Sequence, residues 1–430
     1  PSAAMAGMQV TLHFDPTRLL LVSATPVAGQ PFAIETSEDI DNTLGTLRYA
    51  IGIDAGSGST GLATGAPLFD LAFVLLPSPP ACATNAYLSF APVGTATTRF
   101  TGMDGSTVDA IPGLVPTLRL DSAGPVLDGM IAATTVPTDA GSSYGGFVAA
   151  PTVTATDDCD GARAVSLSIA LAGGSTASSW PADGLFPIGT STVTWSSSDA
   201  LGNLSTVSRT VTVENHQLLD AAIAFQGAVA GTSSRQVRIT VGAQTTLHTV
   251  AMTGSSGAVT GLQVPVAAGY ACVRAKDPVH AISDASAPAV VARRYAAAFT
   301  MKQGDSNDDD LVDIFDFALF LSNRGGGKAT NAVSNFNGDT VVNNADFAYV
   351  SLNFLQAGES CASGLDGDAP QPRTRVSVKE LRRSGLGDLA VADINRDGWL
   401  DTRDMQLYLQ GGSAGGSVAS PEAAAAAPGW

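Results

Sequence analysis

An acidic pattern occurs three times in the C-terminal third of the chain and restricts what this part can fold into. Each copy places Asp or Asn at positions 1, 3, 5, 9 and 12 of a twelve-residue segment, and an apolar run with helical spacing follows each copy. Three matches at one spacing argue against chance. The side chains are Asp305, Asn307, Asp309, Asp313 and Asp316, then Asn335, Asn337, Asp339, Asn343 and Asp346, then Asp393, Asn395, Asp397, Asp401 and Asp404.

This spacing predicts loops that bind calcium. Ca²⁺ is a hard cation that takes about six to eight oxygen ligands at ~2.3–2.6 Å, and a twelve-residue loop supplies these side chains plus the main-chain carbonyl of position 7. Those carbonyls belong to Leu311, Val341 and Trp399. Position 8 is apolar each time, as expected where paired loops join by a short β-bridge. We expect two to three Ca²⁺ ions; the alternative is a set of solvated Asp/Asn turns.

The second loop is expected to bind most weakly. The first and third loops carry four carboxylates each at these positions, whereas the second carries only Asp339 and Asp346. Position 6 favours glycine because the chain turns sharply there. Gly398 can adopt the sharp turn at position 6 without strain. Asp310 tolerates such a backbone, whereas the β-branched Thr340 adopts it poorly.

Aspartate rather than glutamate at position 12, with the opening GDSNDDDLVD, resembles the dockerin type I family. The first two loops would form the dockerin pair, and a capping box at Ser377 and Glu380 suggests a separate leading helix for the third. In dockerins, positions 10 and 11 contact cohesins and are hydroxyl-rich and duplicated. The pairs here are Ile314-Phe315, Asn344-Ala345 and Thr402-Arg403. The resemblance therefore supports calcium binding but not the cohesin partner.

The apolar residues around the loops are few. We expect a small core around Phe317, Phe320, Phe347 and Leu352. Such a core offsets little of the entropy lost on ordering, so the region after about Gly304 should depend on calcium for its fold.

The first part of the chain alternates apolar and polar residues as β-strands do. Val10, Leu12 and Phe14 alternate with polar side chains, and Asp15-Pro16 ends the run with a turn. The stretches MQVTLHFDPTRLLLVSATP and GAPLFDLAFVLL resemble the cohesin-like β-sandwich of bacterial surface proteins and scaffoldins. That resemblance implies a sandwich over residues 1–122 whose first strand is missing.

The missing strand leads to a hypothesis about assembly. An edge beside Val10 and Leu12 would be open, and a segment of a neighbouring copy could pair with it. Head-to-tail contacts of this kind propagate into a filament. The alternative is that the missing strand precedes the chain as given.

Residues 123–215 form a second expected unit. The run FPIGT at 186–190, followed by Val193, Trp195 and the turn DALGN, resembles the hyalin-repeat (HYR) family of immunoglobulin-like sandwiches. From the residues alone, Val193 and Trp195 point to one side of a strand and DALGN supplies a hairpin turn. Residues 216–300 hold further candidate strands and loosely resemble domains that precede calcium-loop repeats in exported planctomycete-like proteins.

These patterns predict a mainly β chain, with serial β-sandwich domains followed by a small α-helical calcium module. Charged residues make up only 14% of the chain, and Ala, Gly, Ser, Thr and Val dominate. That composition suits sandwiches with short loops. Domains are expected at 1–122, 123–215, 216–300 and 301–410, with a low-complexity tail at 411–430.

Charge, hydropathy and cysteines limit the location and the partners. The net charge is −17, and no Lys/Arg cluster could neutralise phosphates, which excludes nucleic acid. No apolar run reaches the ~18 residues of a membrane span. The chain starts at Pro1, which we interpret as a processed or trimmed N-terminus, so the missing signal peptide does not indicate the cytoplasm. We expect a secreted or cell-surface protein. Four cysteines allow three disulfide pairings, and free buried thiols are the alternative; they are Cys82, Cys159, Cys272 and Cys361.

Two enzyme motifs occur in contexts that do not suit them. GxGxxG at 56–61 is followed by Gly65 and Pro67, which prevent the helix that a dinucleotide site needs. Ser413 lies in GxSxG within the Gly/Ser-rich tail, with no strand before it or helix after it. The four histidines are scattered, with no Cys or acid at ligand spacing. No catalytic residue or organic cofactor is predicted.

The chain is therefore expected to be a non-enzymatic, calcium-stabilised structural or adhesive protein outside the cell. Its partners would be other copies of itself or other surface proteins, with polysaccharide as a further candidate. The alternative is a dockerin- or cohesin-type component of an extracellular assembly that binds or degrades polysaccharide. An enzyme with an unrecognised site is a third alternative.

Overall fold

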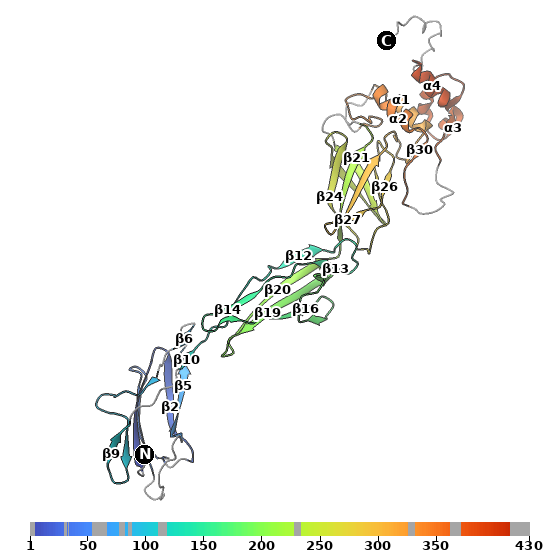
Figure 1. Cartoon of the computed structure of the whole chain (residues 1–430). Helices are drawn as coiled ribbons and strands as arrows, with labels where there is room; N and C mark the ends of the chain where they lie inside the picture. The colour runs from blue at the N-terminus through green and yellow to red at the C-terminus, as the bar shows by residue number, and fades with distance from the viewer. Residues whose placement is uncertain are drawn as a thin grey trace. The chain divides into compact units, whose positions relative to one another are not determined.

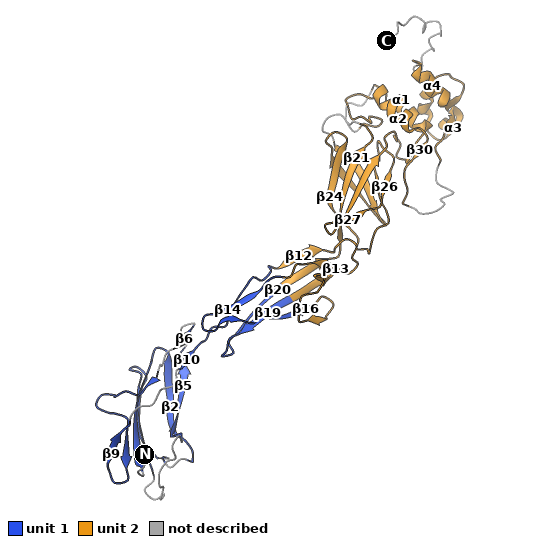
Figure 2. Cartoon of the chain, in the orientation of Figure 1, with its two compact units in different colours: residues 1–132, 151–169, 193–209 blue, residues 133–150, 170–192, 210–430 orange. Residues whose placement is uncertain are grey.

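A computed structural model describes residues 5–29, 32, 34–53, 67–76, 82–84, 88–110, 118–227, 234–325, 332–361 and 371–412. The chain is mainly β with a small group of helices near its C-terminal end, which confirms the predicted fold class (Figure 1). Two compact units comprise residues 1–132, 151–169 and 193–209, and residues 133–150, 170–192 and 210–430 (Figure 2). The GxGxxG motif and Ser413 lie outside the described residues. No helix within the described ranges is long and apolar enough to cross a membrane.

Unit 1 opens with a β-sandwich whose buried residues alternate along the strands. Val10, Leu12, Leu21, Leu47 and Tyr49 are all buried in one core, as the period of two predicts. The main sheet has the order β3 (Ile34–Asp41), β4 (Thr46–Gly52), β1 (Met5–Phe14), β8 (Arg99–Gly102) and β9 (Thr107–Asp109), with β7 (Leu88–Ser89) also on β1. β2 (Leu19–Pro26) pairs with β5 (Phe69–Leu75), and β6 (Ala83–Thr84) pairs with β10 (Arg119–Leu120).

Strand β1 is paired on both sides, which contradicts the expected open edge. On one side it runs antiparallel to β4. On the other side β8 and β7 pair with its two ends, and between them the Thr11 N–H donates to Thr98 Oγ1 at 3.0 Å. The stretch from Val10 to Leu12 has no open edge, because the Thr98 side chain, from the segment between β7 and β8, bonds to the Thr11 backbone. The filament hypothesis, which required that edge to be open, is wrong.

Residues 123–215 are divided between the two units. In unit 1, β14 (Thr154–Asp157) pairs with β11 (Val126–Asp128) and β15 (Gly161–Arg163). In unit 2, β12 (Thr134–Pro137) pairs with the end of β20 (Leu204–Glu214), and β13 (Gly145–Phe147) pairs with β18 (Leu185–Pro187). The remaining strands here are β16 (Ser166–Ala170), β17 (Thr176–Ala177) and β19 (Gly189–Ser198). Val193 and Trp195 are buried at alternate positions of β19, as predicted.

Two four-stranded sheets of unit 2 enclose a core of their own, and we call residues 217–303 the third sandwich. Its buried side chains include Ile223, Val237, Ile239 and Phe299. One sheet has the order β24 (Ser256–Val264), β21 (Gln217–Phe225), β28 (Arg294–Met301) and β27 (Ala289–Val291). The other has the order β23 (Gln244–Ala251), β22 (Ser234–Val241), β25 (Val273–Lys276) and β26 (Asp284–Ser286).

The helical region, residues 304–412, has a larger core than the sequence predicts. Phe317, Phe320 and Phe347 are buried as expected, and Ile282 of the third sandwich belongs to the same cluster. Leu352 is 65% exposed, so its assignment to the core is wrong. The helices are α1 (Ile314–Asn323), α2 (Asn344–Asn353), α3 (Val378–Arg383) and α4 (Thr402–Leu409), with a 3-10 helix η1 at Gly387–Ala392. Three of them, α1, α2 and α4, begin at position 10 of an acidic loop, so each predicted loop leads into a helix.

The acidic loops pair with neighbouring segments and not with one another in the strands that the structure describes. β29 (Leu311–Val312) of the first loop pairs with β30 (Gln356–Ala357). β32 (Trp399–Asp401) of the third loop pairs with β31 (Arg375–Ser377). The expected β-bridge between paired loops is therefore wrong, because segments after α2 and before α3 take that place.

All four cysteines form disulfides. Cys82 is bonded to Cys159 in unit 1, and Cys272 is bonded to Cys361 in unit 2. The fold thus selects one of the three pairings that the sequence allowed. The second disulfide joins the third sandwich to the helical region. Structural disulfides persist in oxidising compartments such as the cell exterior.

Candidate metal centres

The three acidic segments fold as loops that share the same hydrogen bonds at their ends. Position 12 lies in the first turn of the following helix, and its carboxylate accepts the N–H of position 9. The N–H···O distances are 2.8 Å for Asp313 to Asp316, 3.0 Å for Asn343 to Asp346 and 2.9 Å for Asp401 to Asp404. The position-9 side chain caps the helix in return, so the two residues form a capping box.

Positions 3, 5 and 7 also follow one pattern. The position-3 amide donates to the position-5 carboxylate, which accepts the N–H of position 7. The first contact measures 2.8 Å from Asn307, 2.9 Å from Asn337 and 3.0 Å from Asn395. The second measures 3.0 Å from Leu311, 2.7 Å from Val341 and 2.9 Å from Trp399. Each loop therefore gathers its oxygen-bearing side chains around one turn of backbone.

The third loop contains a carboxylate oxygen that lacks a partner. Gly398, with φ 86°, donates its N–H to Asp393 Oδ2 at 3.0 Å. Asp393 Oδ1 is buried and has no hydrogen-bond partner among the residues that the structure places. A buried polar atom without a partner costs free energy. A divalent cation would supply the missing interaction, so the side chains of this loop fit Ca²⁺.

The first loop has the same backbone course. Asp310 adopts φ 68° where the third loop has Gly398, and its N–H donates to Asp305 Oδ2 at 3.0 Å. An aspartate thus tolerates the left-handed turn at position 6. Asp305 and Asp316 are fully buried, and two further carboxylates complete the set. This loop also fits a divalent cation.

Burial raises the pKa of the position-12 carboxylates. Desolvation raises the pKa of Asp316 well above its usual range, and nearby Asp305 and Asp309 act in the same direction. Desolvation also raises the pKa of Asp346 and Asp404. The loop carboxylates therefore resist being charged together, and a bound cation would relieve this.

Basic side chains of the third sandwich lie against the first loop, and sequence reasoning missed them. Lys276 Nζ contacts Asp305 Oδ2 and lies 3.4 Å from Asp310 Oδ1, while Arg274 also contacts Asp310. Burial lowers the pKa of Lys276, but these carboxylates outweigh burial and the pKa is raised. Both basic residues lie on β25, and nothing in the sequence links that strand to the loop.

The second loop departs from the other two. Thr340, at position 6, does not take the left-handed conformation. Asn335 Nδ2 donates instead to the Asp339 carbonyl at 2.8 Å. Asn343 Nδ2 donates to the carbonyl of Val341 at 3.2 Å, which is the position-7 carbonyl predicted as a ligand. These residues fit Ca²⁺ less well than those of the first and third loops.

A buried charged cluster lies beneath the second loop, and sequence reasoning missed it too. Arg235 is fully buried and donates from Nη2 to the carbonyls of Phe336 and Asn335, at 2.9 and 3.4 Å. Buried Asp277 lies 3.8 Å from Arg235 Nη1 and 3.0 Å from His280 Nδ1. The run KDPVH contains two of these residues, but only the fold brings Arg235 to them.

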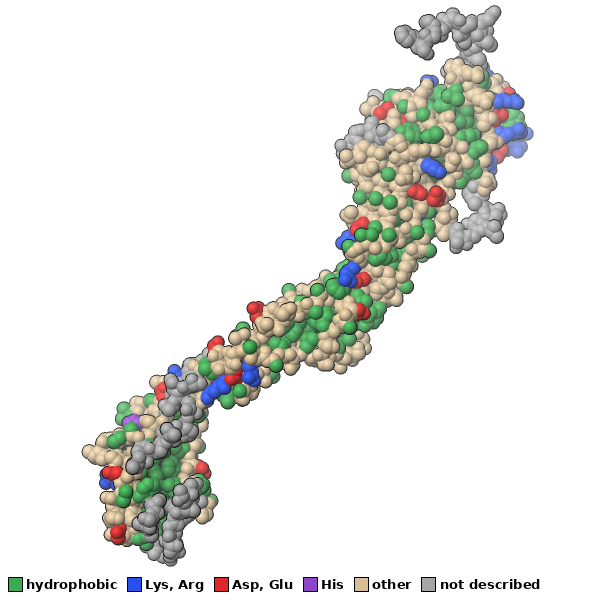
Figure 3. Space-filling view, viewed as in Figure 1, with side chains coloured by type: hydrophobic (Ala, Val, Ile, Leu, Met, Phe, Trp, Pro, Cys, Tyr) green, Lys and Arg blue, Asp and Glu red, His purple; other side chains and the backbone are tan. Residues whose placement is uncertain are grey.

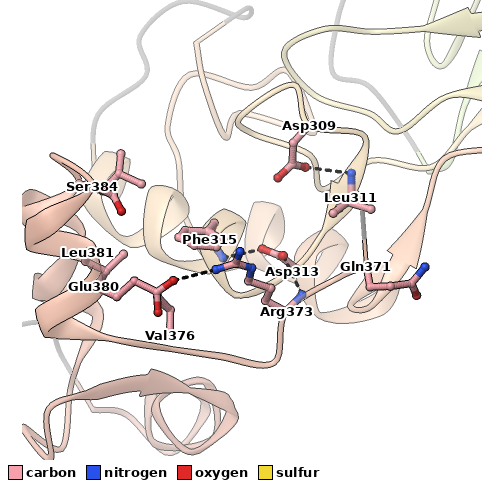
Figure 4. Close-up of a pocket in the computed structure, with 11 residues that line it drawn as sticks. Asp309, Leu311, Asp313, Phe315, Gln371, Arg373, Val376, Glu380, Leu381 and Ser384 are labelled. Carbon is pink, nitrogen blue, oxygen red and sulfur yellow. Dashed lines mark hydrogen bonds and ion pairs between the residues drawn. The ribbon is translucent and has the colours of Figure 1, made fainter. Parts of the chain in front are cut away.

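A cavity of 360 Å³ opens beside the first loop (Figure 4). Asp309 and Asp313 line it together with Arg373 and Glu380. The main-chain N–H of Arg373 donates to Asp313 Oδ2 at 2.8 Å, and the Arg373 guanidinium pairs with Glu380 at 3.0 Å. Two predicted ligands, Asp309 and Asp313, therefore border this space.

A second acidic cluster lies in unit 1 and is organised by hydrogen bonds of its own. Asp121, Asp157 and Cys159 lie close together, but the Cys159 sulfur is bonded to Cys82. Asp157 Oδ1 accepts the main-chain N–H of Cys159 at 2.9 Å, and Arg119 Nη2 lies 3.4 Å from Asp121 Oδ2. The carboxylates serve the local turns, and we assign no metal here.

All four histidines lie outside the helical region and are separated from one another. Two of them face an acid, contrary to the expectation from the sequence: His280 Nδ1 lies 3.0 Å from Asp277, and His216 Nε2 lies 3.6 Å from Glu214. His13 Nε2 lies 3.0 Å from the Pro92 carbonyl, and His248 Nε2 lies 2.7 Å from Thr246 Oγ1. On the face drawn in Figure 3, acidic and basic side chains are interspersed. None of these four contacts combines the acid, base and nucleophile that hydrolytic catalysis brings together.

No family model matches the chain, and no curated protein matches it in sequence. Among solved structures it is similar to the type II cohesin dyad of an adaptor scaffoldin from Acetivibrio cellulolyticus, at 9% identity and TM-score 0.20, over 70% of this chain and 90% of that chain. It is also similar to a structure from a 1.5-MDa bacterial ice-binding adhesin, at 12% identity and TM-score 0.23, over 71% and 87%. It is similar as well to a Ca²⁺-stabilised adhesin of an Antarctic bacterium, at 13% identity and TM-score 0.21, over 69% of this chain and 66% of that chain. Scores this low carry no information about ligands or partners.

Proposed function

We propose that this chain is a non-enzymatic structural or adhesive protein of the cell exterior, and that Ca²⁺ in the first and third loops stabilises its helical region. The observation that carries the proposal is the buried Asp393 Oδ1, which lacks a partner inside a loop of five oxygen-bearing side chains. The repeated hydrogen-bond pattern of the loops supports it. Serial sandwiches and two disulfides suit a load-bearing role outside the cell. The predicted domain limits and the dockerin and hyalin-repeat resemblances belong to this proposal.

The ion would fix the start of a helix to a short strand. In the third loop the side chains of Asp393, Asn395, Asp397, Asp401 and Asp404 and the Trp399 carbonyl would hold it. The loop then joins β32 to α4, and the position-12 carboxylate sits at the positive end of the helix dipole. The first loop would do the same for β29 and α1.

Calcium titration of the full chain tests this part of the proposal. Asp305→Ala and Asp393→Ala should each remove one bound ion in calorimetry, because each deletes the position-1 ligand of its loop. Asp388→Ala is the matched control, since it removes a carboxylate of the helical region outside the loops. Unchanged binding in both loop variants would contradict the metal assignment.

The alternative, a dockerin-type component of a polysaccharide-binding assembly, gains little from the first loop. Ile314, at position 10, is fully buried and cannot contact a partner. Binding to insoluble polysaccharide, compared with binding of the chain to itself, separates the two functions. Retention on polysaccharide without self-association would favour the alternative.

A further inference from the structure

The second loop offers a cation less charge than its two neighbours. Of its five side-chain positions, only Asp339 and Asp346 are carboxylates. Two acidic ligands attract a divalent ion more weakly than four do, because calcium affinity rises with the number of charged ligands. A fixed positive charge nearby would weaken the attraction further.

The hydrogen bonds inside this loop also use groups that an ion would need. The Asp339 and Val341 carbonyls can only accept, so Asn335 and Asn343 must turn their Nδ2 atoms toward them. Asn343 Oδ1 accepts the N–H of Ala345 at 2.7 Å, as the position-9 oxygen does in the other two loops, so the difference lies in the amide nitrogen that occupies the Val341 carbonyl. Side-chain amides of the second loop therefore donate to carbonyl groups of the same loop.

Arg235 places a buried positive charge beside the second loop. Its guanidinium comes from β22, is fully buried, and donates to the carbonyls of positions 1 and 2. Burial lowers the pKa of Arg235, and the nearby carboxylates of Asp277 and of Asp346, at position 12, act against this electrostatically. Lys276 contacts the first loop through carboxylate side chains, whereas Arg235 donates hydrogen bonds to the backbone of the second loop.

We propose that the second loop takes no Ca²⁺ and that Arg235 of the third sandwich holds it in place. This inference rests on the proposed calcium function of the first and third loops. The loop then serves as a calcium-independent anchor, because its position depends on a buried guanidinium and on the Asp277–His280 pair behind it. A buried charge of this kind is stable only while its partners remain in place.

Calcium stoichiometry of position-12 variants tests the first half of the inference. The full chain should bind two ions, Asp316→Asn and Asp404→Asn should each bind one, and Asp346→Asn should bind two with affinities within about threefold of the parent chain. Loss of an ion in Asp346→Asn, or three ions in the parent chain, would overturn the inference. A parent chain that binds no calcium would contradict the proposed function instead.

Hydrogen exchange tests the second half. Arg235→Met should speed amide exchange over residues 334–346 by about a hundredfold, both with and without calcium, because it removes the buried guanidinium that bonds to the backbone of this loop. Arg238→Met is the matched control, since Arg238 lies on the same strand and pairs with Asp308 at 3.0 Å near the surface. Recovery of protection in Arg235→Met on adding calcium would show that the loop takes the ion after all. If Arg235→Met does not fold, the number of calcium ions bound by Asp346→Asn still tests whether the second loop binds an ion.

Discussion

Lys276 places a positive charge against the first position of the first loop. Its Nζ contacts Asp305 Oδ2, the oxygen that also accepts the Asp310 N–H, and both side chains are buried. In the metal-free protein this pairing offsets the burial of Asp305. Once an ion binds, the same ammonium repels it across a short distance. Lys276 therefore stabilises the empty loop and weakens the filled one.

Lys276→Met should raise the calcium affinity of the first loop by about tenfold or more, because it removes that repulsion. Titration in an Asp404→Asn background isolates this loop. In chelator the variant should lose about 3 kcal/mol of unfolding free energy, since Asp305 is left buried and unpaired. Lys302→Met, which removes a contact to Gln356 at 3.2 Å, is the control. Unchanged or weaker binding in Lys276→Met would refute the argument.

Acid should weaken calcium binding from a higher pH than ordinary carboxyl groups require. The pKa of Asp316 is raised, so protons compete with the ion while ordinary aspartates are still charged. In the metal-free fold, the stabilising effect of this raised pKa is complete below the ordinary carboxyl pKa and is lost as the pH rises through the folded value. Calorimetry in buffers of different ionisation enthalpy should show proton release on binding. Affinity that stays constant down to the ordinary carboxyl range would contradict this.

At the scale of elements, the three loops differ in what holds them when calcium is absent. The first two touch the third sandwich through Lys276 and Arg235. The third loop joins η1, β32 and α4 and has no ion pair with the sandwich among the placed residues. Its helix is fixed mainly by packing, since Tyr408 meets the Phe347 ring at 4.9 Å between centroids and its hydroxyl donates to Asn344.

Chelation should therefore loosen the third loop first. Limited proteolysis in EDTA should give the earliest new cleavage between residues 393 and 412, while the sandwiches stay intact. The rest of the helical region should resist cleavage, because its core is larger than the sequence predicts. Asp393→Ala with calcium present should show the same early cleavage. Equal resistance with and without EDTA would count decisively against a role for the ion.

At the scale of the whole molecule, unit 2 is tied together along its length. Gln217 Nε2 donates to the carbonyls of Asp139, Ser142 and Ala267, which links residues before and within the third sandwich. The Cys272–Cys361 disulfide then connects that sandwich to the helical region. Covalent and buried polar contacts thus support the acidic loops from one side.

Removing this disulfide should lower the unfolding free energy of unit 2 by about 2–4 kcal/mol, because the open chain gains entropy. The variant is Cys272→Ser with Cys361→Ser, followed by thermal unfolding in calcium. Cys82→Ser with Cys159→Ser is the matched control and should leave the transition of unit 2 unchanged. Equal losses in that transition for both variants would mean that the disulfide does not act locally.

Local patterns determined much of this protein. The alternation at Val10 and Leu12 and at Val193 and Trp195 predicted strands, and the loop spacing predicted where α1, α2 and α4 begin, because both depend on residues close in sequence. The calcium sites themselves stay predictions. Tertiary structure decided the partners of β1, the exposure of Leu352 and the disulfide pairing. It also brought Lys276 and Arg235 to the loops, since such contacts depend on how distant strands stack, which no local spacing records.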